Sequence, residues 1–332
     1  MRSLLSKPAA LVLIAVLGVM TAACGCPESS SGSESTEGTD AEQPQRADTS
    51  APTPQLRTLP TVMMGVDAYF GASNMSGRSF YSDGMWAASG PAYPSVTYLR
   101  WDSPAGDACK LSFGSGDLYT SSEAMCDQPV EAFWQMPAGK TVVTFGKYWV
   151  PFAQQEWLYE PKPGIMAQWT GGRMSVAASA NYNTELNCPN AYMRAGYKLA
   201  SDAELGVSFG IGNGFCVNSV HDRGFALDTN IGFGGFRLYG EYNRYAAREP
   251  GSVFEFLSGK LYYEKLGALK PFLASFSWDD ASEEFGHFRS TVFGLDYQLS
   301  PTLGIQGAFS TTSDSPVSWL QLHWAYEKAL DR

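Results

Sequence analysis

Apolar and polar residues alternate along most of the chain after residue 60. In the segment TVFGLDYQLSPTLGIQGAFSTTS, residues 291–313, Phe293, Leu295 and Tyr297 are separated by small or polar residues, and a second alternating segment follows a short Ser-Pro-Thr turn. An alternation of period two predicts β-strands with one apolar and one polar face. The segment is therefore predicted to form a β-hairpin.

The same alternation recurs in sixteen short segments. No stretch with helical periodicity separates them, which favours an antiparallel meander over parallel crossovers. Sixteen strands are the first expectation, and twelve or fourteen remain compatible with the segment lengths. The segments lie near residues 61–70, 93–102, 108–115, 129–136, 141–149, 164–170, 173–183, 190–199, 203–212, 222–232, 235–245, 252–265, 269–278, 287–299, 302–311 and 316–327.

The connections between these segments fall into two kinds that alternate along the chain. One kind is short, such as GFGG and LSPT, and the other is longer and polar, such as residues 71–92 and 116–128. Short turns at one end and longer loops at the other are typical of a transmembrane β-barrel, with the turns in the periplasm and the loops outside the cell. An even number of strands places both chain ends on the turn side.

The apolar faces are predicted to point outward, toward lipid. A soluble sandwich or propeller is the alternative, but it needs a second apolar layer that no segment supplies. A closed barrel satisfies every backbone group in lipid. The predicted fold class is therefore an all-β transmembrane antiparallel β-barrel. Aromatic residues near strand ends are expected to form interfacial girdles; they include Trp101, Trp134, Trp149, Trp169, Trp278, Trp319 and Trp324.

Composition agrees with this fold class. The 332 residues are 44% apolar and 14% aromatic but only 17% charged, which excludes disorder for most of the chain. Beyond the N-terminus no apolar run is long enough for a membrane helix, and a barrel strand needs none.

The N-terminus carries an export signal. A basic start with Arg2 and Lys7 precedes an apolar core at residues 9–20, so residues 1–23 are predicted to be a signal peptide. Cys24 follows small residues and is predicted to be lipidated; ordinary cleavage after Ala23 is the alternative. The Ser-, Glu- and Pro-rich residues 24–58 are predicted to form an acidic tether, and residues 59–332 the barrel.

Several strands resemble those of bacterial outer-membrane porins, particularly the phosphate-selective type. The segments VTYLRWDSPAGDACKLSFGSGDLY, TVVTFGKYWVPFAQQEW and FLSGKLYYEKLGALKPF carry the resemblance, which covers about residues 61–328. It implies a water-filled channel for passive diffusion of small hydrophilic solutes or ions, a third loop that folds inward, and a homotrimer. Membrane lipid is the other expected partner; no cofactor, metal or nucleic acid is expected.

Polar positions that alternate with the apolar ones are predicted to line the pore. Both signs of charge occur among them, without the ladder of Lys and Arg that a phosphate pore would need. By the resemblance, Glu156 and Glu160 of the third loop would face Arg100 and Lys110 at a constriction and favour cations weakly. The remaining candidate charged positions are Arg194, Lys198, Arg237, Glu241, Lys260 and Asp296.

The cysteines allow a disulfide without fixing its pairing. Cys188 and Cys216 fall in neighbouring predicted loops, so a bond between them is plausible in an exported protein. Sequence cannot choose among the pairings that include Cys109 and Cys126.

Catalytic motifs are missing from the sequence. The chain lacks a G-x-S-x-G motif and the spacing of metal ligands, so an enzyme is not expected. Besides a porin, a lipidated structural or adhesin barrel with a plugged lumen fits the pattern, and an outer-membrane enzyme comes after it.

Overall fold

The structure is a computed structural model that describes ten stretches of the chain. These are residues 60–74, 80–81, 95–114, 129–153, 161–184, 188–212, 221–247, 253–280, 286–312 and 316–330.

The described residues form one antiparallel sheet in which each predicted segment has a counterpart. The sixteen barrel strands are accompanied by β2, a two-residue strand, so the elements number seventeen. They are β1 (Thr61–Ser73), β2 (Phe80–Tyr81), β3 (Val96–Asp102), β4 (Ala108–Gly114), β5 (Pro129–Ala138), β6 (Thr141–Trp149), β7 (Pro161–Gly171), β8 (Met174–Asn183), β9 (Cys188–Ala200), β10 (Ala203–Ile211), β11 (His221–Phe233), β12 (Phe236–Ala247), β13 (Val253–Tyr263), β14 (Leu269–Asp280), β15 (His287–Ser300), β16 (Leu303–Thr312) and β17 (Val317–Ala329).

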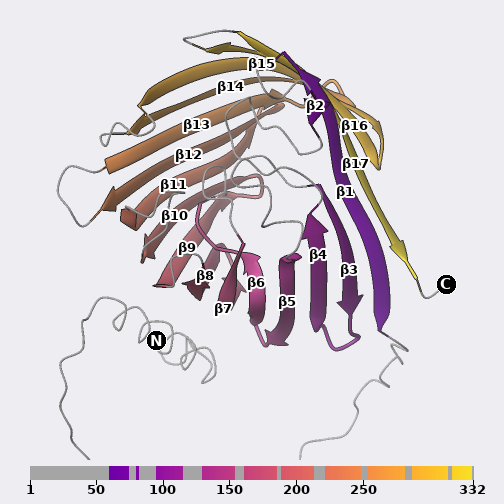
Figure 1. Cartoon of the computed structure of the whole chain (residues 1–332), viewed down its shortest axis with the longest axis vertical. Coiled ribbons are helices and arrows are strands. Elements are labelled where there is room, and N and C mark those ends of the chain that lie inside the picture. Colours follow the sequence, from indigo (N-terminus) through magenta and orange to yellow (C-terminus); the bar gives the residue numbers. More distant parts are fainter. Residues whose placement is uncertain are drawn as a thin grey trace, which may run out of the picture.

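The sheet closes on itself between its first and last strands. Met63 of β1 lies opposite Ala329 of β17, and the other edge of β1 pairs with β3, with Thr61 opposite Asp102. Consecutive strands pair around the rest of the sheet, and Figure 1 shows how the curved sheet returns β17 to β1. Each of the sixteen barrel strands thus has a partner on both sides, as a bilayer-spanning sheet requires.

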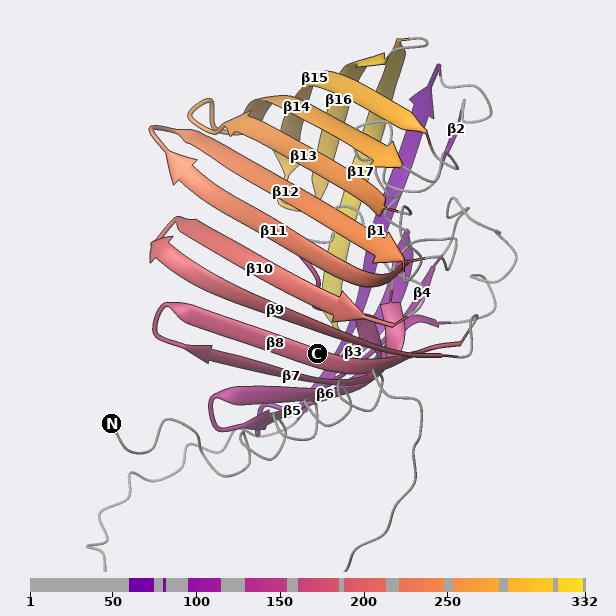
Figure 2. The same cartoon turned by 90° about the vertical axis from the view of Figure 1, so that its left-hand side faces the viewer.

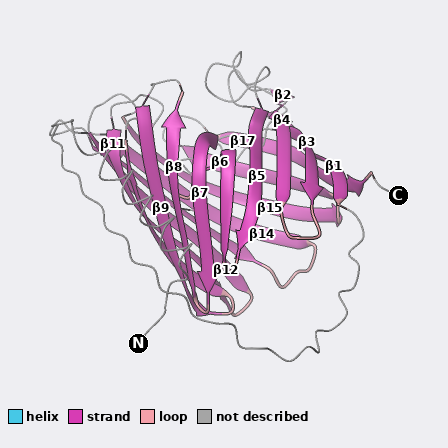
Figure 3. Cartoon of the chain, turned by 90° about the horizontal axis from the view of Figure 1, so that it is seen from below, coloured by secondary structure: helices cyan, strands magenta, loops and turns pink. Residues whose placement is uncertain are grey.

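The short connections lie together at one end of the barrel. Figure 2 shows the turns between β5 and β6, β7 and β8, and β9 and β10 along one rim, and Figure 3 shows the short connections gathered at one end. The turn between β11 and β12 contains Gly234 and Gly235 with φ of 58° and 94°. Two successive left-handed residues give the tight hairpin turn whose twist matches the strands, which explains the glycine pair.

Exposure separates the two faces of the strands as the alternation predicted. In β10, Leu205 and Phe209 are 43% and 45% exposed, whereas Ser208 between them is fully buried. Trp134 and Trp324 are exposed on the outer face as well. An apolar surface around the barrel therefore follows from the period of two.

The prediction that the tryptophans lie in interfacial girdles was wrong for two of them. Trp319 is 4% exposed and belongs to an apolar cluster on the inner face, and Trp278 packs against that cluster. Trp319 occupies an inner position, since its neighbour Leu320 is exposed, and Trp278 lies two positions along β14 from the buried Phe276. Among the described residues, no helix combines the length and the apolar character needed to cross a membrane.

Candidate functional site: the barrel interior

An arginine bound by two carboxylates lies on the inner wall of β9 to β11. Arg194 Nε and Nη2 donate hydrogen bonds to the two oxygens of Asp228, at 2.9 and 2.6 Å, and Nη2 also lies 3.0 Å from Glu204 Oε1. The Asp228 side chain is only 1% exposed. The glycine at position 206 leaves room for the Asp228 carboxylate, because a Cβ at Gly206 would lie 2.3 Å from Asp228 Oδ2. The network carries one positive and two negative groups.

A second ion pair joins β4 and β5. Lys110 Nζ contacts Glu131 Oε2, and the same carboxylate accepts a hydrogen bond from Ser112 Oγ at 3.3 Å. Lys110 also lies 5.0 Å from the ring centroid of Tyr98. Glu131 is 7% exposed, so its charge is compensated inside the wall rather than in water.

Two further arginines near the turn end have acidic partners. Arg100 Nε donates to Asp102 at 3.0 Å, and the Arg100 side chain is 46% exposed. Arg237 bridges β11 to the end of β13: it lies 3.2 Å from Glu264 and donates to the side-chain oxygen of Asn230. Arg100 and Arg237 thus each form an ion pair with a nearby acidic side chain.

The remaining candidate residues have mixed surroundings. Glu241 accepts a hydrogen bond from Asn243, and Asp296 accepts one from Gln306 at 2.7 Å. Lys260 is 6% exposed, and its ammonium lies near two aromatic rings. Lys198 is exposed near the end of β9.

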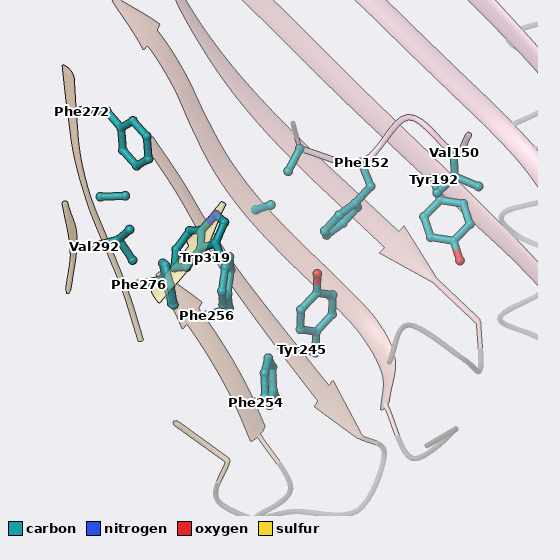
Figure 4. Close-up of a cluster of buried hydrophobic side chains, with 13 residues drawn as sticks. Val150, Phe152, Tyr192, Tyr245, Phe254, Phe256, Phe272, Phe276, Val292 and Trp319 are labelled. Carbon is teal, nitrogen blue, oxygen red and sulfur yellow. The ribbon is translucent and has the colours of Figure 1, made fainter. Parts of the chain in front are cut away.

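Part of the interior is lined by apolar side chains. A cluster of buried side chains lines the inner face of β9, β11 to β15 and β17, and Figure 4 shows its aromatic rings gathered over these strands. Tyr245 and Phe254 have no exposed surface, and Phe276 is 2% exposed. The inner face therefore carries apolar and polar side chains on the same strands, such as Phe256 and Lys260 of β13, and the alternation of the strands did not predict the apolar ones.

The start of the third loop enters this apolar region. Val150 and Phe152 are 0% exposed, and Ala153 is 7% exposed. The Ala153 amide donates a hydrogen bond to Ser208 Oγ of β10 at 2.9 Å, although the two residues are 55 positions apart in the chain. The predicted inward course thus holds for residues 150–153.

Several predicted site residues lie outside the described residues. Glu156, Glu160 and Cys24 all lie outside the described part of the chain. The constriction opposite Arg100 and Lys110 and the lipidation of Cys24 therefore stay predictions. Cys188 opens β9, but Cys216 and Cys126 are outside the described part, and the disulfide pairing stays a prediction.

Two residues that organise the interior were not predicted from the sequence. Glu131 has the alternating parity of an inner position and could have been assigned to the pore wall on that signal. Phe152 carries no periodic signal, because it lies beyond the end of β6. Within the ranges that the structure describes, no group of three or more His, Cys, Asp and Glu residues is placed to hold a metal ion.

Comparison with known proteins places the fold among bacterial outer-membrane barrels. No family model matches the chain, and no curated protein matches it. A loop-deletion mutant of OmpT, an outer membrane protein of Vibrio cholerae, is 11% identical with a TM-score of 0.60, covering 81% of this chain and 100% of that one. The anion-selective porin of Comamonas acidovorans is 12% identical with a TM-score of 0.60, covering 80% of this chain and 99% of that one. A mutant of the Rh. blastica porin is 9% identical with a TM-score of 0.54, covering 81% and 100%. At these identities the likeness is one of fold.

Proposed function

We propose that the chain is an outer-membrane porin that lets small hydrophilic solutes or ions diffuse passively through its lumen. One observation carries the proposal: a closed sixteen-strand barrel has an exposed apolar outer surface and charged groups on its inner wall. An apolar exterior suits lipid, and a polar interior suits water. The porins among its structural neighbours support this interpretation.

The pairing of charges on the wall supports weak rather than strict ion selectivity. Arg100, Lys110 and Arg237 each lie beside one acid, whereas Arg194 lies beside two. A filter for one ion needs rings of a single sign. The proposed preference is a weak one for cations, because the network around Arg194 has surplus negative charge.

Location and assembly belong to the same proposal. The barrel lies in the outer membrane of a Gram-negative bacterium, with lipid as its main partner and an acylated Cys24 holding residues 24–58 at the periplasmic surface. A homotrimer is proposed as well; one structural neighbour, with a TM-score of 0.56, is described as the trimer form of Vibrio cholerae OmpT.

Single-channel recording in a planar bilayer tests the proposal. The purified, folded protein should give discrete steps of ionic current, and the same protein denatured before addition should give none. Slow unfolding in heated gel samples verifies that the barrel is folded. A folded barrel that inserts into the bilayer without conducting would overturn the porin assignment.

Reversal potentials in a salt gradient test the selectivity. Replacing Glu156 and Glu160 by Gln should shift the reversal potential toward anions, and replacing Arg100 and Lys110 by Gln should shift it the other way. Both shifts should grow at low salt, where the Debye length reaches about 30 Å at 0.01 M. If neither double variant shifts the reversal potential, the proposed constriction is wrong, while the proposed channel is unaffected.

A barrel with a plugged lumen is the second candidate function. The buried aromatic residues of the inner wall favour it, since Tyr245, Phe254 and Phe256 are at most 1% exposed inside a barrel whose interior would otherwise hold water. Such a protein would act as a structural or adhesive element. Absence of conductance from the folded barrel would favour it over the porin.

A further inference from the structure

Two ionisable side chains face the lumen where the first and last strands of the barrel meet. Asp67 of β1 and His323 of β17 are 39% and 41% exposed, whereas the side chain of Asp228 is 1% exposed. His323 occupies an inner position, because its neighbours Leu322 and Trp324 are exposed on the outer face. The exposed surface of this pair therefore faces the lumen rather than lipid.

A hydrogen bond and a ring stack hold the pair together. His323 Nε2 lies 2.6 Å from Asp67 Oδ1, although the two residues are 256 positions apart in the chain. The Tyr69 ring, directly opposite His323 in the register, stacks on the imidazole with centroids 4.4 Å apart and planes 4° from parallel. Asp67 lies opposite Ala325, whose small side chain leaves room for the diagonal contact. The orientation of the imidazole is therefore fixed by two neighbours.

We infer that Asp67 and His323 form a proton-dependent charge pair that sets the ion preference of the channel. The inference rests on the proposed porin function. With a neutral imidazole the pair carries one negative charge, and with a protonated imidazole it carries none. An arginine stays charged at every physiological pH, whereas a histidine ordinarily changes its charge between about pH 5 and pH 8. The pair is thus a charge of the inner wall that a change of pH can switch.

The hydrogen bond determines which nitrogen of the ring carries the proton. An ionised carboxylate only accepts hydrogen bonds, so the contact with Asp67 requires a proton on His323 Nε2. The neutral ring is therefore the Nε2–H tautomer, and acidification adds the second proton at Nδ1. Aspartates ordinarily titrate near pH 4, below the range in which histidines do. Acidification therefore changes the charge of the pair without removing its hydrogen bond.

The groups around the pair leave a surplus of acid. Charged and titratable side chains face the pair from its own and the neighbouring strands, while the inner positions of β16 beside it, Gly304 and Gln306, carry no charge. These side chains are Tyr69 of β1, Glu327 of β17, and Tyr98, Arg100 and Asp102 of β3.

The one arginine in this group does not neutralise the pair. Arg100 is bound to Asp102 at 3.0 Å, and Tyr98, which is hydrogen-bonded to Glu327, lies within electrostatic range of Asp67. Within the described ranges, no lysine or arginine forms an ion pair with Asp67 or Glu327. When the imidazole is neutral, both carboxylates therefore attract cations to this side of the lumen.

Reversal potentials at two pH values test the effect on ion preference. In a KCl gradient, the folded protein should prefer cations at about pH 8, and its permeability ratio of K⁺ to Cl⁻ should fall roughly twofold at about pH 5.5. This is the size expected for one unit charge about 8 Å from the ion path in water at about 0.1 M salt.

Two variants separate the partners of the pair. His323→Gln keeps an amide donor for Asp67 but cannot gain a proton, so its permeability ratio should equal the wild-type value at high pH and stay there at low pH. Asp67→Asn removes the negative charge, so its ratio should be lower at high pH and fall further at low pH, where an imidazolium without its carboxylate remains.

A second histidine–aspartate pair provides a matched control on the outer face. His287 Nδ1 lies 2.9 Å from Asp279 Oδ1, with side chains 81% and 59% exposed. His287 occupies an outward position, because the buried Ser290 and Val292 mark the inner positions of β15. His287→Gln should therefore keep the wild-type dependence of the permeability ratio on pH.

Nitrogen NMR with isotope-labelled histidine tests the pair without relying on conduction. In folded barrels in detergent micelles, the signals of His323 are assigned by their loss in His323→Gln. The imidazole proton should reside on Nε2 at high pH, and Nδ1 should gain a proton at low pH. A neutral ring with its proton on Nδ1 would overturn the pair.

The outcomes separate the pair from the porin function. A preference that depends on pH in the wild type and in His287→Gln but not in His323→Gln supports the inference. A conducting wild type with the same preference at both pH values, or a dependence that survives in full in His323→Gln, overturns it. A folded barrel that does not conduct overturns the porin assignment and with it the ion preference, and the NMR result then tests the hydrogen bond alone.

Discussion

The Arg194 network allows a sharp prediction about barrel stability. Removing the cation by Arg194→Gln leaves the Asp228 carboxylate, 1% exposed, without its two charge-assisted hydrogen bonds. Removing the anion by Asp228→Asn is milder, because Arg194 keeps Glu204 at 3.0 Å and the new amide still offers one acceptor oxygen.

The expected changes in unfolding free energy differ in size. Loss of one partner of a buried pair costs about 3–5 kcal/mol, which we expect for Arg194→Gln. The Asp228→Asn change should cost about 1–3 kcal/mol, the range for an imperfectly satisfied buried hydrogen bond. Because the double variant Arg194→Gln with Asp228→Asn buries no unpaired charge at position 228, it should be more stable than Arg194→Gln alone.

Urea unfolding of the barrel in lipid vesicles, followed by tryptophan fluorescence, measures these differences. The exposed pair Arg244–Glu255, with side chains 55% and 43% exposed and 3.6 Å apart, provides the control. Arg244→Gln should cost less than about 1 kcal/mol. A double variant less stable than Arg194→Gln would refute the argument, since it would mean that the buried charge is not what destabilises the single variant.

Three further outcomes are expected. Gly206→Ala should lower the urea midpoint, because its Cβ would meet a carboxylate oxygen at 2.3 Å, whereas Gly259→Ala, whose nearest contact is 4.0 Å, should change it little; equal shifts would contradict this. Mass spectrometry of the mature N-terminal peptide should show acyl chains on Cys24, and an unmodified peptide would indicate ordinary cleavage. A membrane-impermeant reagent on intact cells should label a tag placed in residues 184–188 but not one in residues 234–235, and the reverse pattern would invert the topology.

The strands and their faces were readable from the sequence because they depend on local order. An alternation such as Phe293, Leu295 and Tyr297 fixes which side chains share a face without reference to any partner strand. The two kinds of connection, short and long, then indicate the meander and its closure. All sixteen predicted segments became strands for this reason.

Aromatic residues were the weak point of that prediction. Trp319 and Trp278 are apolar and were therefore expected to face lipid, yet they occupy inner positions, Trp319 within the buried cluster and Trp278 packed against it. The apolar character of these residues predicts the outer face, whereas their position in the alternation predicts the inner face. The position decides the orientation, because the neighbouring outward positions of the sheet, such as Leu320, are already apolar.

The partners inside the barrel were decided by the tertiary structure alone. Arg194 meets Asp228 from 34 positions away because the register of β9, β10 and β11 aligns them, and Phe152 meets Tyr245 because the start of a loop folds across the interior. Periodicity records on which face a side chain lies. It carries no information on the register between strands or on the path of a loop, and those two quantities determine which inner residues touch.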